Sequence, residues 1–190
     1  MKILFTLVLI LLLFACGEEI PVPKPPTYLR LELPDHNYRK VESCQFSYDL
    51  AKEYLNGVEQ LGQKGDCAFE VDLGRLNGKL YVFYYPLQAG DTLSKFINFA
   101  NDKVDDHKLK ATAINDEKIL RPKDRVFGTF FELQGDVATN YQFYLTDSVS
   151  HFVRAELLLN ARPNYDSLRP SLDYIKQDLK KMMNSLQWKK

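Results

Sequence analysis

The sequence lacks an excess of charge of either sign. Its 190 residues include 25 Lys and Arg against 25 Asp and Glu, so the formal net charge at pH 7 is zero. No basic stripe stands out along the chain, and both observations argue against nucleic acid as a partner. The composition is also not acidic enough for a disordered chain. We therefore expect a folded domain that does not bind nucleic acid.

The sequence also lacks the short motifs that mark common catalytic and cofactor sites. It contains no phosphate loop, dinucleotide fingerprint, zinc-ligand spacing or haem attachment motif. Asp147, Ser148 and His151 supply the residue types of a hydrolytic triad within five positions, but no G-x-S-x-G elbow accompanies them. We predict that they form a turn, in which Asp and Ser bond to nearby backbone. We expect no catalytic residues and no cofactor.

A second group of acidic residues could suggest a metal site. It consists of Asp102, Asp105, Asp106 and His107. Lysines are interleaved with these residues at 103, 108 and 110, which is typical of a solvated helix surface. We therefore predict an exposed, charged helix end without a bound metal.

The apolar run that opens the chain is too short to be a good membrane-spanning helix. Residues 3–15 would extend only about 20 Å as a helix, against a hydrocarbon core of about 30 Å. Lys2 precedes the run, and the small residue Ala15 is followed by Cys16, as in a lipoprotein signal. We predict that residues 1–15 are removed and that Cys16 is acylated and anchors the protein to a membrane. An ordinary signal peptide with an accidental cysteine, or an uncleaved anchor, are the alternatives.

The remaining chain divides into a spacer and one domain. Residues 16–27 comprise the acylated cysteine and a proline-rich segment that favours an extended conformation. Residues 28–190 fit a single domain with a sizeable core. The predicted location is the cell envelope, with the domain in the periplasm. The choice between inner and outer membrane stays open.

Two cysteines remain once Cys16 is acylated. In an oxidising compartment, Cys44 and Cys67 are expected to form a disulfide. The rival interpretation is a metal site, but two isolated cysteines without nearby histidines do not supply four ligands.

The hydrophobic pattern predicts an α+β fold in which helices sandwich an antiparallel β-sheet. A helical turn at residues 49–55 is followed by a glycine-marked loop at residues 57–65. The strand at 80–85 is apolar on both faces, which indicates a central strand covered on both sides. Asp91 is predicted to cap a first helix, and a last helix is predicted to begin near residues 166–167 with Pro170 in its first turn. Strands are predicted at residues 28–33, 45–48, 67–73, 80–85, 112–120, 126–133, 141–146 and 152–159.

Three polar or aromatic side chains allow two interpretations each. Gln142 and Tyr144 share one strand face and are expected to face water, although they could line a polar groove. Trp188, near the end of the chain, is expected to pack on the core rather than mark a partner surface.

Several tracts along the chain are similar to a known family. They comprise residues 23–25 and 28–32, the cysteines at 44 and 67, and residues 126–128, 142–148, 151–152, 163–167, 174–176 and 188–189. Together with the lipoprotein signal, they resemble the gliding motility lipoprotein GldD family of the Bacteroidetes. The resemblance implies an envelope component that is required for gliding and associated with type IX secretion and adhesin delivery. It implies protein partners from that machinery and no enzymatic activity. The element order also looks loosely like the PsbP/Mog1 type of sandwich.

A function of another class stays open beside this one. With 11 Tyr and 12 Phe, the chain could line a pocket for a small molecule or glycan with aromatic side chains.

Overall fold

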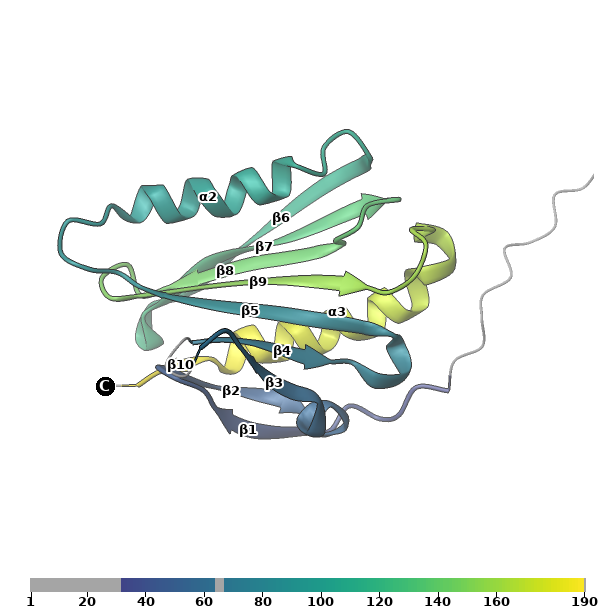
Figure 1. Ribbon diagram of the computed structural model, residues 1–190, viewed down its shortest axis with the longest axis horizontal. Coiled ribbons are helices and arrows are strands. Elements are labelled where there is room, and N and C mark those ends of the chain that lie inside the picture. Colours follow the sequence, from purple (N-terminus) through teal and green to yellow (C-terminus); the bar gives the residue numbers. More distant parts are fainter. Residues whose placement is uncertain (1–31, 64–66, 190) are drawn as a thin grey trace, which may run out of the picture.

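The large sheet forms the middle layer of the molecule (Figure 1). The computed structural model describes residues 32–63 and 67–189, so the predicted signal peptide, Cys16, the spacer and residues 28–31 lie outside the described residues. One helix lies over one face of the sheet, and a second helix and a small sheet lie on the other side (Figure 1). The predicted α+β class, with an antiparallel sheet between helices, is confirmed.

Within the described residues, the large sheet has seven strands, all antiparallel to their neighbours. Its order is β3-β4-β5-β9-β8-β7-β6. The predicted meander over the second half of the chain is confirmed as β6 to β9. The strands are β3 Val58–Leu61, β4 Ala68–Asp72, β5 Gly78–Pro86, β6 Ala111–Arg121, β7 Val126–Gly135, β8 Tyr141–Thr146 and β9 His151–Leu159.

Strand β5 has neighbours on both sides, as predicted, and pairs with β9 along its whole length, from Gly78 opposite Leu159 to Pro86 opposite His151. Its inward residues Leu80 and Val82 are buried. The prediction of cover on both faces is wrong, because the alternate side chains stay partly exposed.

The small sheet contains β1 (Tyr38–Glu42), β2 (Phe46–Ala51) and β10 (Gln187–Trp188), in the order β1-β2-β10. Strand β2 confirms the predicted strand at 45–48 and extends it, so the helical turn predicted at 49–55 begins later, as the 3₁₀ helix η1 (Lys52–Gly57). Two further 3₁₀ turns are η2 (Gly74–Leu76) and η3 (Pro122–Asp124).

Besides the two-residue strand β10, two short edge strands were not predicted. The described end of the predicted strand 28–33, residues 32–33, is not in a strand, and the first described strand is β1 instead. Strand β3 occupies part of the predicted loop between glycines. Both are edge strands with exposed polar residues, so neither has the alternating apolar pattern that marks a strand.

The helices are α2 (Leu93–Asp105) and α3 (Tyr165–Ser185). Thr92 precedes α2, while Asp91 accepts the backbone N–H of Gln88 in the preceding turn, so the predicted Asp91 cap is wrong. Asn164 caps α3 through the N–H of Ser167 at 3.2 Å. Helix α3 therefore begins near the predicted start, and Pro170 lies just beyond its first turn rather than within it.

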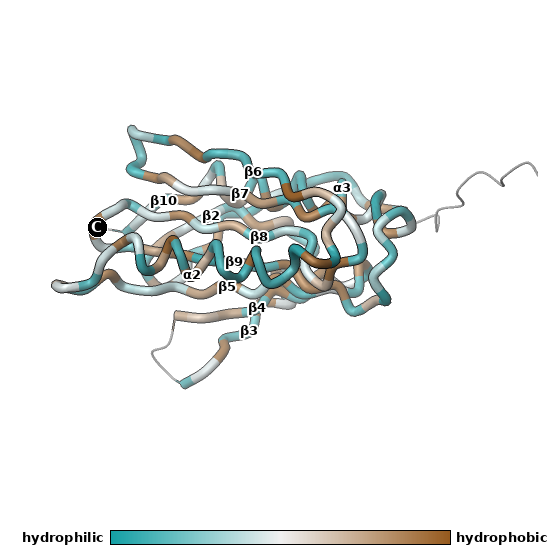
Figure 2. The backbone as a smooth tube through the Cα atoms, turned by 90° about the horizontal axis from the view of Figure 1, so that it is seen from above, coloured by the Kyte–Doolittle hydropathy of each residue, from teal (hydrophilic) through white to brown (hydrophobic). Residues whose placement is uncertain are grey.

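The main core lies between the large sheet, β2 and α3. The predicted apolar face of α3 is buried there, at Leu172, Ile175, Leu179 and Met182. Smaller clusters lie under α2, where Ala100 packs with Tyr144 and Phe152 and Val104 packs with Leu133. Seen from above, α2 runs along the middle of the large sheet, and β3 and β4 lie to one side of this helix (Figure 2).

Candidate functional sites

The residues that could suggest a triad form a hydrogen-bonded turn between β8 and β9. Asp147 Oδ1 accepts the backbone N–H groups of Val149, Ser150 and His151 at 2.9, 2.8 and 2.8 Å. Burial favours a higher pKa for Asp147, but these three donors hold that pKa below its ordinary value. The carboxylate is thus committed to the backbone, and the predicted turn is confirmed.

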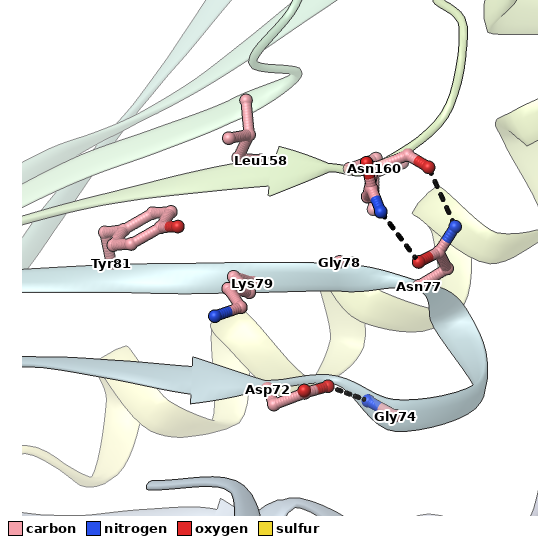
Figure 3. A pocket seen from close by; sticks show the side chains of 9 residues that line it. Asp72, Gly74, Asn77, Gly78, Lys79, Tyr81, Leu158 and Asn160 are labelled. Carbon is pink, nitrogen blue, oxygen red and sulfur yellow. Dashed lines mark hydrogen bonds between the residues drawn. The ribbon is translucent and has the colours of Figure 1, made fainter. Parts of the chain in front are cut away.

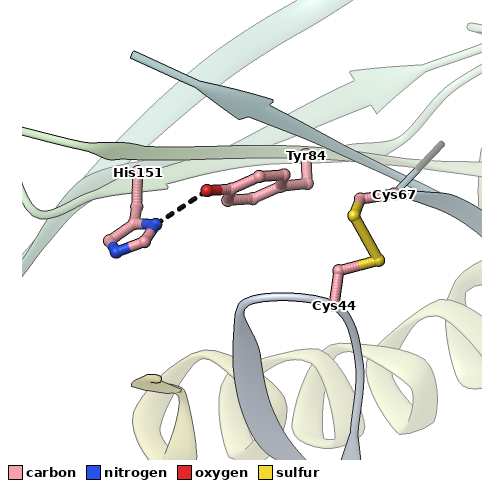
Figure 4. The surroundings of a disulfide bond; sticks show 4 residues. All are labelled: Cys44, Cys67, Tyr84 and His151. Atoms are coloured by element: carbon pink, nitrogen blue, oxygen red, sulfur yellow. Dashed lines mark hydrogen bonds between the residues drawn. A yellow bond between two sulfur atoms is a disulfide. The ribbon is translucent and has the colours of Figure 1, made fainter. Parts of the chain in front are cut away.

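His151 lies beside the cysteine pair, with Tyr84 between them (Figure 4). Its Nδ1 is 2.8 Å from the Tyr84 hydroxyl, and the backbone N–H of Tyr84 donates to the carbonyl of Cys67 at 3.2 Å. Cys44 and Cys67 form a disulfide in the structure, with Cα atoms 5.7 Å apart. Since Cys44 precedes β2 and Cys67 precedes β4, this bond joins the small sheet to the large one.

Trp188 completes this cluster from the end of the chain. Its ring stacks on His151 with centroids 5.0 Å apart and packs edge-on against Phe46. The indole N–H donates to the carbonyl of Arg125 at 2.9 Å. Trp188 is half-buried against the main core, in line with the predicted core packing.

Asp102, Asp105 and Asp106 at the end of α2 are exposed, and Asp105 and Asp106 are paired with lysines. Lys103 Nζ is 3.1 Å from Asp106, and Lys108 Nζ is 2.6 Å from Asp105. Among residues 32–63 and 67–189, no three His, Cys, Asp or Glu side chains gather in a way that could hold a metal ion. The predicted solvated helix end is confirmed.

Gln142 and Tyr144 are buried beneath α2, so the prediction that they face water is wrong. Gln142 donates to the carbonyl of Lys103 at 3.3 Å and accepts from Arg154 at 3.4 Å. The Tyr144 hydroxyl accepts from Thr129 at 3.1 Å. These polar atoms have internal partners because α2 covers this face of β8.

A buried carboxylate that sequence reasoning missed lies on α3. Asp178 is 7% exposed, and its Oδ1 is 2.8 Å from His36 Nδ1 and accepts from the Tyr38 hydroxyl at 2.9 Å. Its Oδ2 accepts from the Tyr54 hydroxyl at 3.0 Å. Burial, followed by the nearby Asp178, raises the pKa of both tyrosines well above the ordinary range. We call these four residues the Asp178 cluster.

A second hydrogen-bonded group extends the Asp178 cluster. Tyr174 donates to Glu53 at 2.7 Å, lies 3.1 Å from the carbonyl of Pro34, and stacks on His36 with ring centroids 4.2 Å apart. The segment before β1 is therefore fixed to α3. The signal in the sequence was an acidic residue inside the apolar row of α3, between Ile175 and Leu179.

A cavity opens at the ends of β4, β5 and β9 (Figure 3) and has a volume of about 440 Å³. Asn77 Nδ2 donates to the carbonyl of Asn160 at 2.8 Å, and Asp72 accepts the N–H of Gly74 at 2.7 Å. Tyr81 and Leu158 flank the opening from neighbouring strands (Figure 3). Its lining thus combines an aromatic ring, an aliphatic side chain and fixed amide and carboxylate groups.

Together, the fold and its fixed clusters define a disulfide-bonded α+β domain. The sequence profile of the gliding motility lipoprotein GldD matches residues 18–188. The chain belongs to the GldD lipoprotein family, so the resemblance drawn from its tracts is confirmed.

Two further comparisons concern curated proteins and solved structures. A search of curated proteins gives no match. Among solved structures, the chain is similar to the solution structure of cyanobacterial PsbP (CyanoP) from Synechocystis sp. PCC 6803. That similarity has a TM-score of 0.49 at 11% identity and covers 86% of this chain and 99% of the other.

Membership of the family gives the chain a role in gliding motility and implies a lipoprotein held at a membrane of the cell envelope. Neither described helix is long and apolar enough to cross a bilayer.

Proposed function

We propose that the protein is a lipid-anchored envelope component that supports gliding motility, type IX secretion and surface delivery of adhesins through contacts with other proteins. The observation that carries this proposal is the family match over residues 18–188, which includes nearly all of the predicted mature chain. Proteins of the gliding and secretion machinery would be its partners. The proposed anchor is the acylated Cys16, followed by the spacer at residues 16–27 and a periplasmic domain at residues 28–190.

Two features support a role without catalysis. Asp147 uses one carboxylate oxygen for three backbone donors, and Asp178 uses both oxygens for side-chain donors. An acid or base that takes part in a reaction needs to reach substrate, whereas these carboxylates hold structure. We therefore assign both to the stability of the fold.

Complementation of a gene deletion in a gliding host tests the proposal. Loss of the gene should abolish colony spreading and reduce surface adhesin, and the wild-type chain should restore both. A chain with Asp147→Asn, Ser148→Ala and His151→Ala should restore spreading if it is made at the normal level. Stable expression of this variant without spreading would show that the turn is a functional site.

Cross-linking in intact envelopes tests the proposed partners. A photoreactive residue at an exposed position, such as Leu120, which is 70% exposed, should capture proteins of the gliding or secretion machinery. The same residue at buried Leu157 provides the matched control and should capture none. If a panel of exposed positions around the domain captures no protein of that machinery, direct contact is refuted.

A further inference from the structure

The outer face of β5 carries a row of aromatic side chains. Leu80 and Val82 point into the main core, so Tyr81, Phe83 and Tyr85 point to the opposite face, and all three are partly exposed. Alternate residues of a strand lie about 6.6 Å apart, which places the three rings in line along one surface. Such a row presents flat apolar faces at regular steps.

Helix α2 covers only one end of this row. Tyr85 packs against Phe96 and Phe99 of α2, with ring centroids 5.9 and 6.5 Å apart. The helix then crosses toward β7, where Val104 packs near Leu133. Figure 2 shows β4 lying beyond the helix on this side. The other end of the row is left open, and Leu158 is 41% exposed there.

Paired charges flank Tyr81 on both neighbouring strands. The residues opposite it are Glu70 on β4 and Glu156 on β9. Glu70 is paired with Lys79, and Glu156 is paired with Arg154. These four charges cancel, and Glu70 and Arg154 are buried, so the surface presents Lys79 and Glu156 beside the ring without an excess cation for an anionic ligand.

Arg154 is fixed between two rings of this face. Its guanidinium carbon lies 5.9 Å from the centre of the Phe83 ring and 5.6 Å from that of Phe99. The side chain is nearly buried, and its Nε has no hydrogen-bond partner in the described structure. The polar groups around the row are therefore held in place by packing, which lowers the entropic cost of binding.

The cavity lies at the open end of the row. Tyr81 and Lys79 line it together with Asp72, Leu158 and Asn160 (Figure 3). Amide and carboxylate oxygens accept hydrogen bonds, and the amide and ammonium groups donate them. The volume of about 440 Å³ is in the range of small-molecule sites.

We propose that this outer face of β4, β5 and β9 binds a neutral oligosaccharide, with one sugar ring on Tyr81 and its hydroxyl groups facing Asp72, Lys79 and Asn160. A pyranose combines an apolar C–H face with a rim of hydroxyl groups, which matches an aromatic ring set among paired charges and amides. A phosphate or uronate ligand fits less well, because Asp72 adds a further negative charge beside the balanced pairs.

A protein partner also fits this surface less well. The centres of protein interfaces are depleted of charged residues, whereas here the partly exposed Lys79 and Glu156 lie beside the Tyr81 ring. The assignment goes beyond the proposed role in gliding and secretion and does not depend on it.

Surface plasmon resonance tests the proposal with the mature lipoprotein, purified from membranes and held in lipid nanodiscs. The probes are neutral hexasaccharides of glucose, of mannose and of N-acetylglucosamine. At least one should bind saturably, with a dissociation constant of about 1 mM or lower. If none of the three binds, the assignment to a neutral oligosaccharide is overturned.

Three variants locate the binding on the face. Tyr81→Ala should weaken binding about tenfold, because it removes the stacking ring, whereas Tyr81→Phe keeps the ring and should stay within about twofold. Leu120→Ala, which removes an exposed apolar side chain from edge strand β6, is the control and should bind as the wild type does. Thermal melting of each variant separates lost binding from lost folding.

Two results would contradict this location. Equal binding by wild type and a folded Tyr81→Ala chain would place the sugar elsewhere. A photoreactive residue at Phe83 that captures a protein from intact envelopes, in a chain that binds no hexasaccharide, would assign the face to a protein partner.

Discussion

Replacing Cys44 and Cys67 together by serine should lower stability more than most surface substitutions. The disulfide between them joins the segment before β2 to the segment before β4, across the two sheets. Serine is close in size to a reduced cysteine, so the double variant removes the cross-link with little change in packing. The loss should therefore reflect the cross-link itself.

The expected loss follows from the length of the closed loop. The cysteines are 23 positions apart, and the chain-entropy relation gives about 3 kcal/mol for a loop of that length. This is a large share of a typical unfolding free energy of about 5–15 kcal/mol. In a domain of this size, about 2–4 °C of melting temperature corresponds to 1 kcal/mol, so the midpoint should fall by about 6–12 °C.

Urea unfolding in the presence and absence of a thiol reductant provides the measurement. Reductant should lower the wild-type midpoint to that of the double variant, and the double variant itself should not respond. The disulfide does not form if reductant leaves the wild-type urea midpoint unchanged and both thiols react with a thiol reagent in native protein from the envelope. That result would also count against an oxidising compartment.

Three other predictions concern the N-terminal anchor, the Asp178 cluster and the pKa of Asp147. Mass spectrometry of the mature N-terminal peptide should show acyl chains on Cys16 and no residues before it; an intact, unmodified segment 2–14 in mature protein contradicts the anchor. Asp178→Asn should reduce the unfolding free energy by about 2–3 kcal/mol, because three partners lose a charged acceptor. The control, Asp173→Asn on the exposed side of α3, should have little effect. Equal losses in the two variants would contradict the role of the Asp178 cluster. Folding lowers the pKa of Asp147, so the stabilising contribution of this carboxylate is complete above the unfolded pKa of about 4 and is lost as the pH falls through the folded pKa. Between about pH 6 and pH 2, the urea midpoint should therefore fall less in Asp147→Asn than in wild type. Parallel curves for the two proteins would contradict this linkage.

The second half of the fold could be predicted from the sequence because its elements form local patterns. Strands β6 to β9 are joined in order, so each predicted strand pairs with the next. The apolar residues of α2 and α3 recur at helical spacing and face the sheet. Local periodicity is sufficient where neighbours in sequence are also neighbours in space.

The first half of the fold depends on contacts that no local pattern contains. Strand β1 is a mostly polar edge strand, and it is a strand because it pairs with β2 rather than because of its own residue pattern. Strand β10 consists of two residues that pair with β2 from the other end of the chain. Sequence reasoning therefore missed the small sheet, although it predicted the strand that lies between them.

The candidate sites show the same limit. The prediction that Gln142 and Tyr144 face water is wrong because no local pattern in the sequence shows which face of β8 is covered by α2. The Asp178 cluster joins residues about 140 positions apart, and the cavity at the end of β5 depends on the long pairing with β9. By contrast, the Asp147 turn was predictable, because all its donors lie within four residues.

The position of these distant contacts bears on how an anchored domain resists tension. The first described residues that follow the proposed spacer are fixed to α3 through His36 and Asp178, and β2 is fixed at its other end by β10 and by the disulfide. A force applied at the N-terminal end of the described residues would therefore act first on contacts with the C-terminal helix rather than on the edge of the large sheet. The hydrogen bonds of Asp178 to His36 and Tyr38 are part-buried and the one to Tyr54 is buried, and hydrogen bonds to a charged group contribute more to stability than neutral ones. The segment before β1 is thus held to the domain through α3, and the outer face of β4, β5 and β9 takes no part in this attachment.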